Sequence, residues 1–464
     1  MVPRLDACAA DDEVETDDEG CDEDPHNGLG PAARKRESGL GERRSHADTL
    51  TSGAIHAGGI LVRTITLVRH AETVSNISGT WQGQTDSPLS DRGRIQVARL
   101  RSRMDGQASG LLVMSDLGRT RATAESIGAG EALAEWREFD LGAWDGLRPE
   151  EIRDRYPEID RVRFGSGDFQ PDGGERFSDF KARLRKAFET LADRLGDGDH
   201  ATVVTHGGAI QTIVGMLLGV ADQSVILVPS NASLTTVRLD GGDIQVSVFN
   251  DDLHLDGGVV RPPGARLRLI RHGQTLGNIE GRWWGRGETP LSDQGRMQAA
   301  MLADVAGPLD SIVSSPLSRA RETAAPVAAV QNKEVTIVDG FAEFYFGEWE
   351  GLSIAEIMEH DGEAFRHIQI DGNDEPRGRI GETFKGVGER MAAAAEQVVS
   401  HGDGTVGVFT HGGATRAYAS LLLGMPFADR EKLPVPRNTA HMELIWAGDE
   451  PRLSSYNVAA HLEN

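Results

Sequence analysis

Short apolar runs that stop at an Arg-His pair occur twice in the chain, and each predicts a buried strand. The first covers residues 65–68 and the second covers residues 267–270. Runs of this length and composition are typical of strands that a parallel sheet buries on both faces. Open α/β sheets bind their ligands beyond the carboxyl ends of the strands. We therefore expect functional residues at the pairs that end the two runs, Arg69-His70 and Arg271-His272.

Strand-like stretches alternate with stretches of helical length in the first half of the chain. Strands are expected at residues 111–114, 201–205, 233–239 and 245–249, and helices beginning at Ser90-Asp91, from Arg119 to Ile127 and from Ala209 to Leu218. This alternation indicates a three-layer α/β/α domain, in which helices flank a mostly parallel central sheet. Asp240-Gly241-Gly242, between the last two strands, is typical of a hairpin turn.

The second half of the chain repeats the first. Four matched segments are WQGQTDSPLSDRGRIQ with WWGRGETPLSDQGRMQ, MSDLGRTRATA with SSPLSRARETA, EFDLGAWDGL with EFYFGEWEGL, and VVTHGGA with VFTHGGA. His272 follows His70 by 202 residues, and His411 follows His206 by 205 residues. A nearly constant offset means that one domain has been duplicated with small changes in its loops. The sequence therefore predicts two tandem α/β/α domains.

The duplication also defines the boundaries that we expect. The domains should occupy residues 61–256 and 265–464, and residues 257–264, which include paired prolines, should form a short linker. Residues 1–60 contain many acidic, Gly, Ser and Pro residues and few apolar ones, which predicts disorder. Residues 11–24 alone hold ten carboxylates and no basic residue. This tail is interpreted either as a solvated extension or as a segment that binds a partner.

Composition and charge exclude several classes of protein. The net charge is −24, from 48 basic and 72 acidic residues, which disfavours binding to nucleic acid or to anionic membranes. No apolar run approaches the roughly 18 residues of a membrane-spanning helix, and the first residues lack a signal-peptide pattern. The two cysteines, Cys8 and Cys21, lie outside both repeats, so a disulfide framework is not expected. These features predict a cytoplasmic protein.

Both repeats resemble the histidine phosphatase superfamily, also called the phosphoglycerate mutase-like family, and its motifs occur in order in each. The resemblance implies the phosphoglycerate mutase-like fold. It also implies that His70 and His272 are the nucleophiles that accept a phosphoryl group. In the first repeat Ala71 replaces the glycine that usually follows this histidine, and we expect the backbone to tolerate it. A neutral imidazole suits the role, because its pKa lies near 6.5 and it attacks phosphorus without a metal.

The resemblance implies a set of residues around the phosphoryl group in each repeat. They are Arg69, Asn76, Arg119 and His206 in the first, and Arg271, Asn278, Arg319 and His411 in the second. Arginine fits this task, because it stays charged and its planar fork of donors matches phosphate oxygens. The glycines that follow each second histidine are expected to let backbone amides approach those oxygens.

The general acid that protonates the leaving alcohol maps to Glu138 in the first repeat and Glu343 in the second. A carboxyl group held against apolar and aromatic neighbours can have its pKa raised into a useful range. We expect Thr73 and Thr275 to support the loop after the nucleophile. Glu175 and Glu382 are expected to order a loop or cap a helix.

Substrate-binding candidates differ between the repeats. Gln82 matches a Gln-Gly substrate loop of the family, whereas the second repeat has Trp284 at that position. Arg416, where the first repeat has Gln211, is interpreted as the site of a second anionic group or as an exposed residue. These differences suggest that the two sites do not read the same leaving group, or that only one of them reads one.

These observations predict a phosphomonoesterase that hydrolyses small phosphorylated metabolites through a phosphohistidine intermediate. We expect no metal and no cofactor, because the 14 histidines do not group with Cys or carboxylates at ligand spacing. One alternative is a phosphoglycerate mutase; the compact spacing of the motifs and the short chain end argue against it. Another alternative is one catalytic copy beside a regulatory copy that binds a phosphometabolite. The substrate and the oligomeric state stay open.

Overall fold

The computed structural model describes residues 62–105, 110–157, 167–399 and 404–462. The predicted disordered tail, residues 1–60, and both cysteines lie outside these ranges. Two copies of one architecture follow each other along the chain. We call the elements from residue 63 to 255 copy 1 and those from residue 266 to 462 copy 2.

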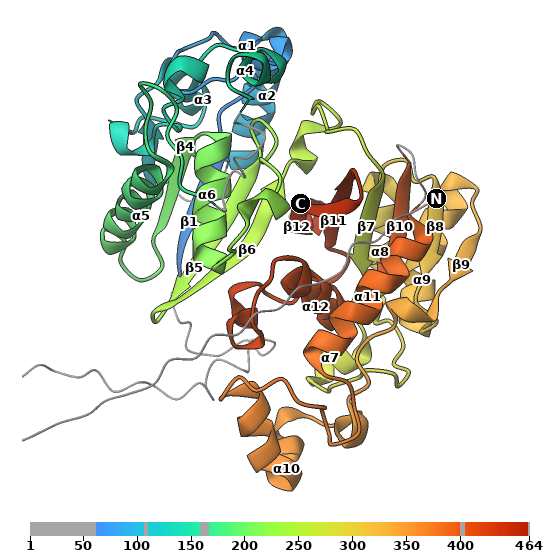
Figure 1. Cartoon of the computed structure of the whole chain (residues 1–464). Coiled ribbons are helices and arrows are strands. Elements are labelled where there is room, and N and C mark those ends of the chain that lie inside the picture. Colours follow the sequence, from blue (N-terminus) through green and yellow to red (C-terminus); the bar gives the residue numbers. More distant parts are fainter. Residues whose placement is uncertain (1–61, 106–109, 158–166, 400–403, 463–464) are drawn as a thin grey trace, which may run out of the picture. The chain divides into compact units, whose positions relative to one another are not determined.

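Copy 1 alternates strands and helices as the sequence predicts (Figure 1). Its strands are β1 (Arg63–Arg69), β2 (Leu111–Ser115), β3 (Glu131–Leu133), β4 (His200–Thr205), β5 (Leu234–Asp240) and β6 (Asp243–Asp251). Its helices are α1 (Val74–Ser78), α2 (Asp91–Met104), α3 (Gly118–Ala124), α4 (Pro149–Arg155), α5 (Phe177–Asp193) and α6 (Gly207–Leu218). Helix α3 ends three residues before the predicted Ile127, and α6 begins two residues before the predicted Ala209.

Copy 2 repeats this order. Its strands are β7 (Arg266–Arg271), β8 (Ser311–Ser314), β9 (Val335–Ile337), β10 (Thr405–Thr410), β11 (His441–Ala447) and β12 (Glu450–Val458). Its helices are α7 (Leu276–Glu280), α8 (Asp293–Val305), α9 (Ser318–Gln331), α10 (Ile354–Gln369), α11 (Phe384–Val398) and α12 (Gly412–Leu422). Helix α10, at 16 residues, is more than twice as long as its counterpart α4, at seven residues.

The sheet of each copy is mostly parallel, as predicted. In copy 1 the strand order is β3-β2-β4-β1-β5-β6. The first four of these strands run parallel, and the hairpin β5–β6 adds two antiparallel strands at one side. Gly241 and Gly242 turn this hairpin with φ values of 55° and 108°, which glycine adopts without a steric penalty. The predicted fold class is confirmed.

The central strands alternate their side chains between two helical layers. In copy 1, Ile65 and Leu67 pack in the same cluster as side chains of α5 and α6, whereas Val68 packs with residues of α2 and α3. Copy 2 divides its strand β7 in the same way, with Leu267 and Leu269 on one face and Ile270 on the other. Because both faces are covered, adjacent residues of each strand are apolar and buried, Leu67 with Val68 and Leu269 with Ile270, which explains the apolar runs in the sequence.

The two copies share one sheet of twelve strands, in which β6 of copy 1 is the neighbour of β12 of copy 2. The pairing is antiparallel at Phe249 and Tyr456. Next to this pair, the Nδ2 of Asn250 donates to the carbonyl of Ser454 and the Nδ2 of Asn457 donates to the carbonyl of Ser247, each at 2.7 Å. The two asparagines occupy equivalent positions, so the copies pair through equivalent strands and neither of these strands is an open edge.

No helix among the described residues is both long enough and apolar enough to cross a membrane.

Candidate active sites

The two predicted histidines of each copy are brought together at the ends of neighbouring parallel strands. The register of β1 and β4 pairs Arg69 with Thr205, so His70 and His206 follow at the same edge of the sheet. The backbone N–H of His70 donates to the carbonyl of Thr205 at 2.9 Å, which continues the ladder by one residue. The ring centroids of His70 and His206 lie 5.4 Å apart. In copy 2 the rings of His272 and His411 lie 5.2 Å apart.

The nucleophile candidate has one defined tautomer. The Nδ1 of His70 lies 2.8 Å from the carbonyl oxygen of Ala71, and the Nδ1 of His272 lies 2.7 Å from the carbonyl oxygen of Gly273. A carbonyl can only accept, so in both rings Nδ1 carries the hydrogen and Nε2 carries the lone pair. The backbone N–H of Ala71 and that of Gly273 donate to equivalent threonines at 3.0 Å. Alanine therefore fits here, as expected.

Burial and neighbouring cations keep these histidines neutral. The pKa of His70 is lowered well below 6.5, chiefly by burial and further by Arg119 and Arg69. The pKa values of His206, His272 and His411 are lowered well below 6.5 in the same way, with burial as the largest cause. A neutral ring is the nucleophilic form, so the environment holds His70 ready for attack.

The lowered histidine pKa values predict acid sensitivity. Below about pH 6.5 these histidines are protonated in the unfolded chain but stay neutral in the folded chain. The free energy of unfolding is therefore highest above that pH and decreases as the pH falls. Each such histidine contributes up to about 1.4 kcal/mol per pH unit. Between about pH 7 and about pH 5.5, urea unfolding should show a smaller decrease in the free energy of unfolding for His206→Asn than for the wild type. The exposed His360→Asn is the control; an equal loss in both variants would contradict this account.

A serine that the sequence analysis did not select orients the second histidine. The Nε2 of His206 lies 2.9 Å from the hydroxyl of Ser115, and the Nε2 of His411 lies 2.7 Å from that of Ser315. The Nδ1 of each second histidine is buried and has no hydrogen-bond partner. If the serine hydroxyl donates to Nε2, the hydrogen of the neutral ring resides on Nδ1, where it can meet an anion.

Ser115→Ala is expected to lower kcat/KM of copy 1 about tenfold, because His206 loses the bond that selects its tautomer. The measurement belongs in a His272→Ala background, so that only copy 1 contributes. Ser78→Ala removes an exposed serine hydroxyl from the same copy and serves as the control. Equal rates for the two variants would show that Ser115 has no part in the site.

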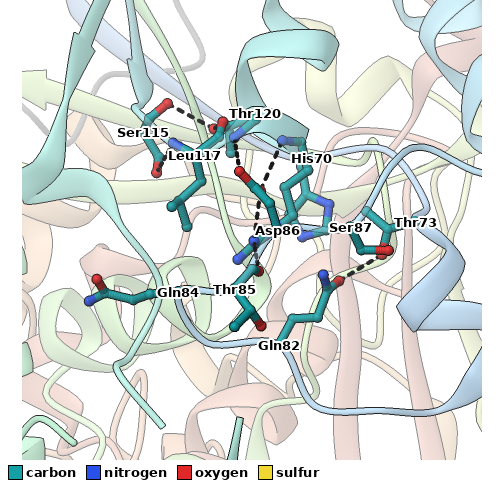
Figure 2. Close-up of polar contacts among 12 residues, drawn as sticks. His70, Thr73, Gln82, Gln84, Thr85, Asp86, Ser87, Ser115, Leu117 and Thr120 are labelled. Atoms are coloured by element: carbon teal, nitrogen blue, oxygen red, sulfur yellow. Dashed lines mark hydrogen bonds and ion pairs between the residues drawn. The ribbon is translucent and has the colours of Figure 1, made fainter. Parts of the chain in front are cut away.

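The two arginines of each site are fixed by backbone carbonyls. Arg69 donates from Nη1 to the carbonyl of Pro229 at 2.6 Å. Arg119 donates from Nη2 to Gly83 at 2.7 Å and from Nη1 to Thr85 at 2.8 Å. Figure 2 shows this loop with the side chains of Gln84, Thr85 and Asp86. Arg271 and Arg319 make the equivalent bonds, to Pro436, Gly285 and Gly287.

Several buried N–H groups in these sites have no partner. In copy 1 they are the Nε of Arg69, the Nε of Arg119, the Nδ1 of His206 and the Nε2 of Gln82. In copy 2 they are the Nε of Arg271, the Nδ1 of His411 and the Nε of Arg286. An unsatisfied buried donor costs about 1–3 kcal/mol, so a group of them in one place indicates a site for an anion with several oxygens.

The predicted acid lies across from the second histidine. The Oε1 of Glu138 accepts from the N–H of Phe139 at 2.9 Å, and its Oε2 accepts from the N–H of Gly208 at 2.8 Å. Burial raises the pKa of Glu138 above 4.5, against the opposing effect of these two bonds. In copy 2, Glu343 accepts from Phe344, Gly413 and Ala414.

The Gly-Gly pair has a different role from the one expected. The N–H of Gly208 donates to the acid Glu138. A Cβ on Gly208 would lie 2.6 Å from Oε1 of Glu138, and one on Gly207 would lie 3.0 Å from Nε of Arg69. These glycines therefore make room for the acid and the arginine. The structure gives no support to the expected approach of the Gly208 amide to phosphate oxygens.

The asparagine candidates and their supporting threonines form the start of a short helix. Thr73 caps α1, and its side chain and that of Asn76 bond each other's backbone N–H reciprocally. Thr275 and Asn278 do the same at α7. The expected support by Thr73 and Thr275 is confirmed. Asn76 also accepts from Asn231, which in turn donates to the carbonyl of His70.

The substrate-binding candidates lie in different surroundings. The hydroxyl of Thr73 donates to Gln82 at 2.7 Å (Figure 2). Trp284 takes this place in copy 2 and packs against Gly277 and Gly351. Arg416 is not exposed, because its side chain is 15% accessible and pairs with Glu431 at 3.0 Å. Its guanidinium also lies over the ring of Phe384.

Glu175 and Glu382 order loops, as expected. Glu175 accepts two bonds from Arg183, at 2.9 and 2.8 Å, and Arg183 also donates to the carbonyls of Glu135 and Arg137. Glu382 is bound by Arg390 in the equivalent way. In residues 62–105, 110–157, 167–399 and 404–462, no group of three or more His, Cys, Asp or Glu side chains is placed to hold a metal ion.

Sequence reasoning missed Ser115, Asn231 and their counterparts Ser315 and Asn438. Asn438 donates to the carbonyl of His272 as Asn231 does to that of His70. A signal for these residues was present, because each is identical in the two repeats. Their roles depend on contacts between distant segments.

The chain is similar in sequence to several known proteins. A glucosyl-3-phosphoglycerate phosphatase of Mycolicibacterium vanbaalenii is 32% identical over 220 residues, covering 43% of this chain and 97% of the relative. A bifunctional protein of Mycobacterium tuberculosis is 37% identical over 150 residues, and the chain spans only 41% of the length of that relative. Other relatives are named phosphoserine phosphatases or probable phosphoglycerate mutases.

A solved structure of a mycobacterial glucosyl-3-phosphoglycerate phosphatase complexed with VO3 is 30% identical; the match covers 42% of this chain and 100% of that one, with a TM-score of 0.39. The family model for the histidine phosphatase superfamily, branch 1, matches residues 65–252 and again residues 267–459, which is most of the chain. The chain therefore belongs to branch 1 of the histidine phosphatase superfamily and contains two tandem copies of its domain.

Proposed function

We propose that the protein is a metal-independent phosphomonoesterase that hydrolyses small phosphorylated metabolites through a phosphohistidine. The observation that carries this proposal is the set of unpartnered buried donors near a neutral histidine of defined tautomer. In copy 1, Arg69 and Arg119 both lie close enough to lower the pKa of His70, and Nε of each is unpaired. A phosphoryl group has the oxygens to meet such donors.

In the first step, Nε2 of His70 attacks the phosphorus opposite the ester oxygen. The N–P bond forms as the P–O bond to the leaving group breaks. The Nε of Arg69, the Nε of Arg119 and the Nδ1–H of His206 bind the three oxygens on which charge spreads. Glu138, which its raised pKa keeps protonated to higher pH, gives its proton to the departing alkoxide.

In the second step, the carboxylate of Glu138 takes a proton from water as the water oxygen attacks the phosphohistidine. The N–P bond breaks, inorganic phosphate leaves, and His70 regains its lone pair. Glu138 is protonated again and ready for the next ester. Copy 2 offers the same groups in His272, Arg271, Arg319, His411 and Glu343.

The test is phosphate release, in the presence of a chelator, from a panel of phosphorylated metabolites that includes 3-phosphoglycerate. The wild type, His70→Ala, His272→Ala and the double variant should be compared. Release by the wild type supports the proposal, and the single variants assign substrates to the copies. Interconversion of 2- and 3-phosphoglycerate without phosphate release would favour the mutase. Loss of activity in one single variant would favour a catalytic copy beside a regulatory one.

A further inference from the structure

The loop clamped by the second arginine carries a different charge in the two copies. In copy 2, Arg319 binds the carbonyls of Gly285 and Gly287, and between them stands Arg286. In copy 1, Arg119 binds the equivalent loop, in which the central residue is Gln84. The second arginine of each site therefore fixes the backbone from which the side chain of Arg286 or Gln84 extends.

Arg286 extends from the loop that Arg319 binds, in the same site as His411. It is among the cations that lower the pKa of His411, together with Arg319 and Arg271, although burial is the largest cause. Its side chain is 37% accessible, and its Nη2 lies 3.4 Å from Glu382. Its Nε is buried without a hydrogen-bond partner. The Nε–H of Arg286 is therefore a donor for which no described residue is the acceptor.

The carboxylate next to Arg286 is already neutralised by another residue. Glu382 accepts from Nε of Arg390 at 2.9 Å and from Nη2 of Arg390 at 3.2 Å, and it also accepts from the N–H of Tyr345 at 2.8 Å. One carboxylate therefore serves two guanidinium groups. Arg286, Arg390 and Glu382 together carry a net charge of +1.

Copy 1 has no excess of positive charge at the matched positions. The Oε1 of Gln84 accepts from Nη1 of Arg137 at 3.0 Å, and Arg137 makes a two-point ion pair with Asp116 at 2.6 and 2.7 Å. Glu175 is bound by one arginine, Arg183. Arg137 and Arg183 therefore each have a carboxylate of their own.

The net charge of six matched positions differs between the two copies. They are Gln84, Asp116, Arg137, Asp140, Glu175 and Arg183 in copy 1, against Arg286, Pro316, Ala342, Tyr345, Glu382 and Arg390 in copy 2. Two cations and three anions give copy 1 a net −1, whereas two cations and one anion give copy 2 a net +1. The phosphate-binding residues are the same in both copies, so the difference acts on the rest of the substrate.

We propose that copy 2 hydrolyses phosphomonoesters whose leaving group carries a second negative charge, which pairs with Arg286, while copy 1 takes leaving groups without one. This assignment rests on the proposed phosphatase function and names the substrate class of each copy. The second charge is a carboxylate or another phosphoryl group, since both match the donors of a guanidinium. Arg286 is a specificity residue in this scheme.

The test compares glycerol 3-phosphate with 3-phosphoglycerate. The first has a hydroxymethyl group where the second has a carboxylate. His70→Ala isolates copy 2 and His272→Ala isolates copy 1, and 4-nitrophenyl phosphate reports whether each copy turns over. The ratio of kcat/KM for 3-phosphoglycerate over glycerol 3-phosphate should be at least about tenfold higher for copy 2. Bisphosphorylated glycerol in place of 3-phosphoglycerate distinguishes a phosphoryl from a carboxylate preference.

Arg286→Gln in the His70→Ala background should lower this ratio about tenfold, and Arg286→Lys should keep most of it. Gln84→Arg in the His272→Ala background should raise the ratio of copy 1. Arg379→Gln is the matched control, because it removes an exposed charge of copy 2 that pairs with Glu348 and Asp361.

Equal ratios for the two copies, or a ratio that Arg286→Gln leaves unchanged, would overturn the charge assignment while the phosphatase stands. If copy 2 fails to turn over 4-nitrophenyl phosphate while copy 1 does, copy 2 is not a phosphatase and the assignment fails with it. Failure of both copies on every ester would overturn the proposed function itself.

Discussion

A chain that carries both His70→Ala and His272→Ala is expected to release phosphate at least about 10⁴-fold more slowly than the wild type. Without Nε2 no covalent intermediate forms, and the remaining arginines can only bind the ester. Removal of a nucleophile is expected to exceed the effect of any single binding residue, because it removes the first bond-forming step.

The single variants provide the internal reference for this result. Each should keep the activity of the other copy, so the double variant must fall below both. His360→Ala, which removes an exposed histidine of copy 2, is the control for loss of a histidine as such. Circular dichroism checks that the variants fold. Substantial turnover by a folded double variant would mean that neither ring is the nucleophile.

The second large effect concerns the acid. Glu138→Gln, measured in the His272→Ala background, should lower kcat about 10²- to 10⁴-fold for esters of poor leaving groups. Burial raises the pKa of Glu138, so the carboxyl stays protonated to a higher pH than usual. The rate of copy 1 should therefore fall as the pH rises through this pKa, and the Gln variant should lose that dependence.

The leaving group provides a sharper test of the same role. 4-Nitrophenyl phosphate releases a stable phenolate that needs little protonation, so its first step should depend far less on Glu138. Glu135→Gln removes an exposed carboxylate of the same segment and is the control. An equal loss in the rate of the first step for both kinds of ester would show that Glu138 acts by position or charge rather than as the acid, because its role as base belongs to the second step.

Much of the architecture could be predicted from the sequence, because strands buried on both faces must be apolar and the copies repeat their motifs. The strand ends at Arg69 and Arg271, the hairpin at Gly241-Gly242 and the mostly parallel sheet were all predicted. The pairing of β6 with β12 was not. Asn250 and Asn457 each bond the backbone of the other copy's strand, and an asparagine within a strand does not reveal which strand it will contact.

The candidate sites were also predicted only in part. The placing of His70 and His206 at the ends of two strands follows from the sequence, whereas the pairing of those two strands was seen only in the structure. The contact of Gly208 with Glu138 was not predicted, because it joins the backbone of one loop to a side chain from another. The difference between Gln84 and Arg286 is visible in the sequence, but its consequence depends on the ion pairs formed by the charged residues around each position, which the sequence does not give.

In the proposed reaction the phosphoryl group passes through Nε2 of the nucleophilic histidine. The most direct measurement is rapid quenching of the wild type with a slowly hydrolysed ester, followed by peptide mapping under alkaline conditions that preserve phosphohistidine. The account predicts a phosphoryl group on Nε2 of His70 or His272, absent from the matching Ala variant. Turnover with no labelled histidine, or with the label on another residue, would contradict it.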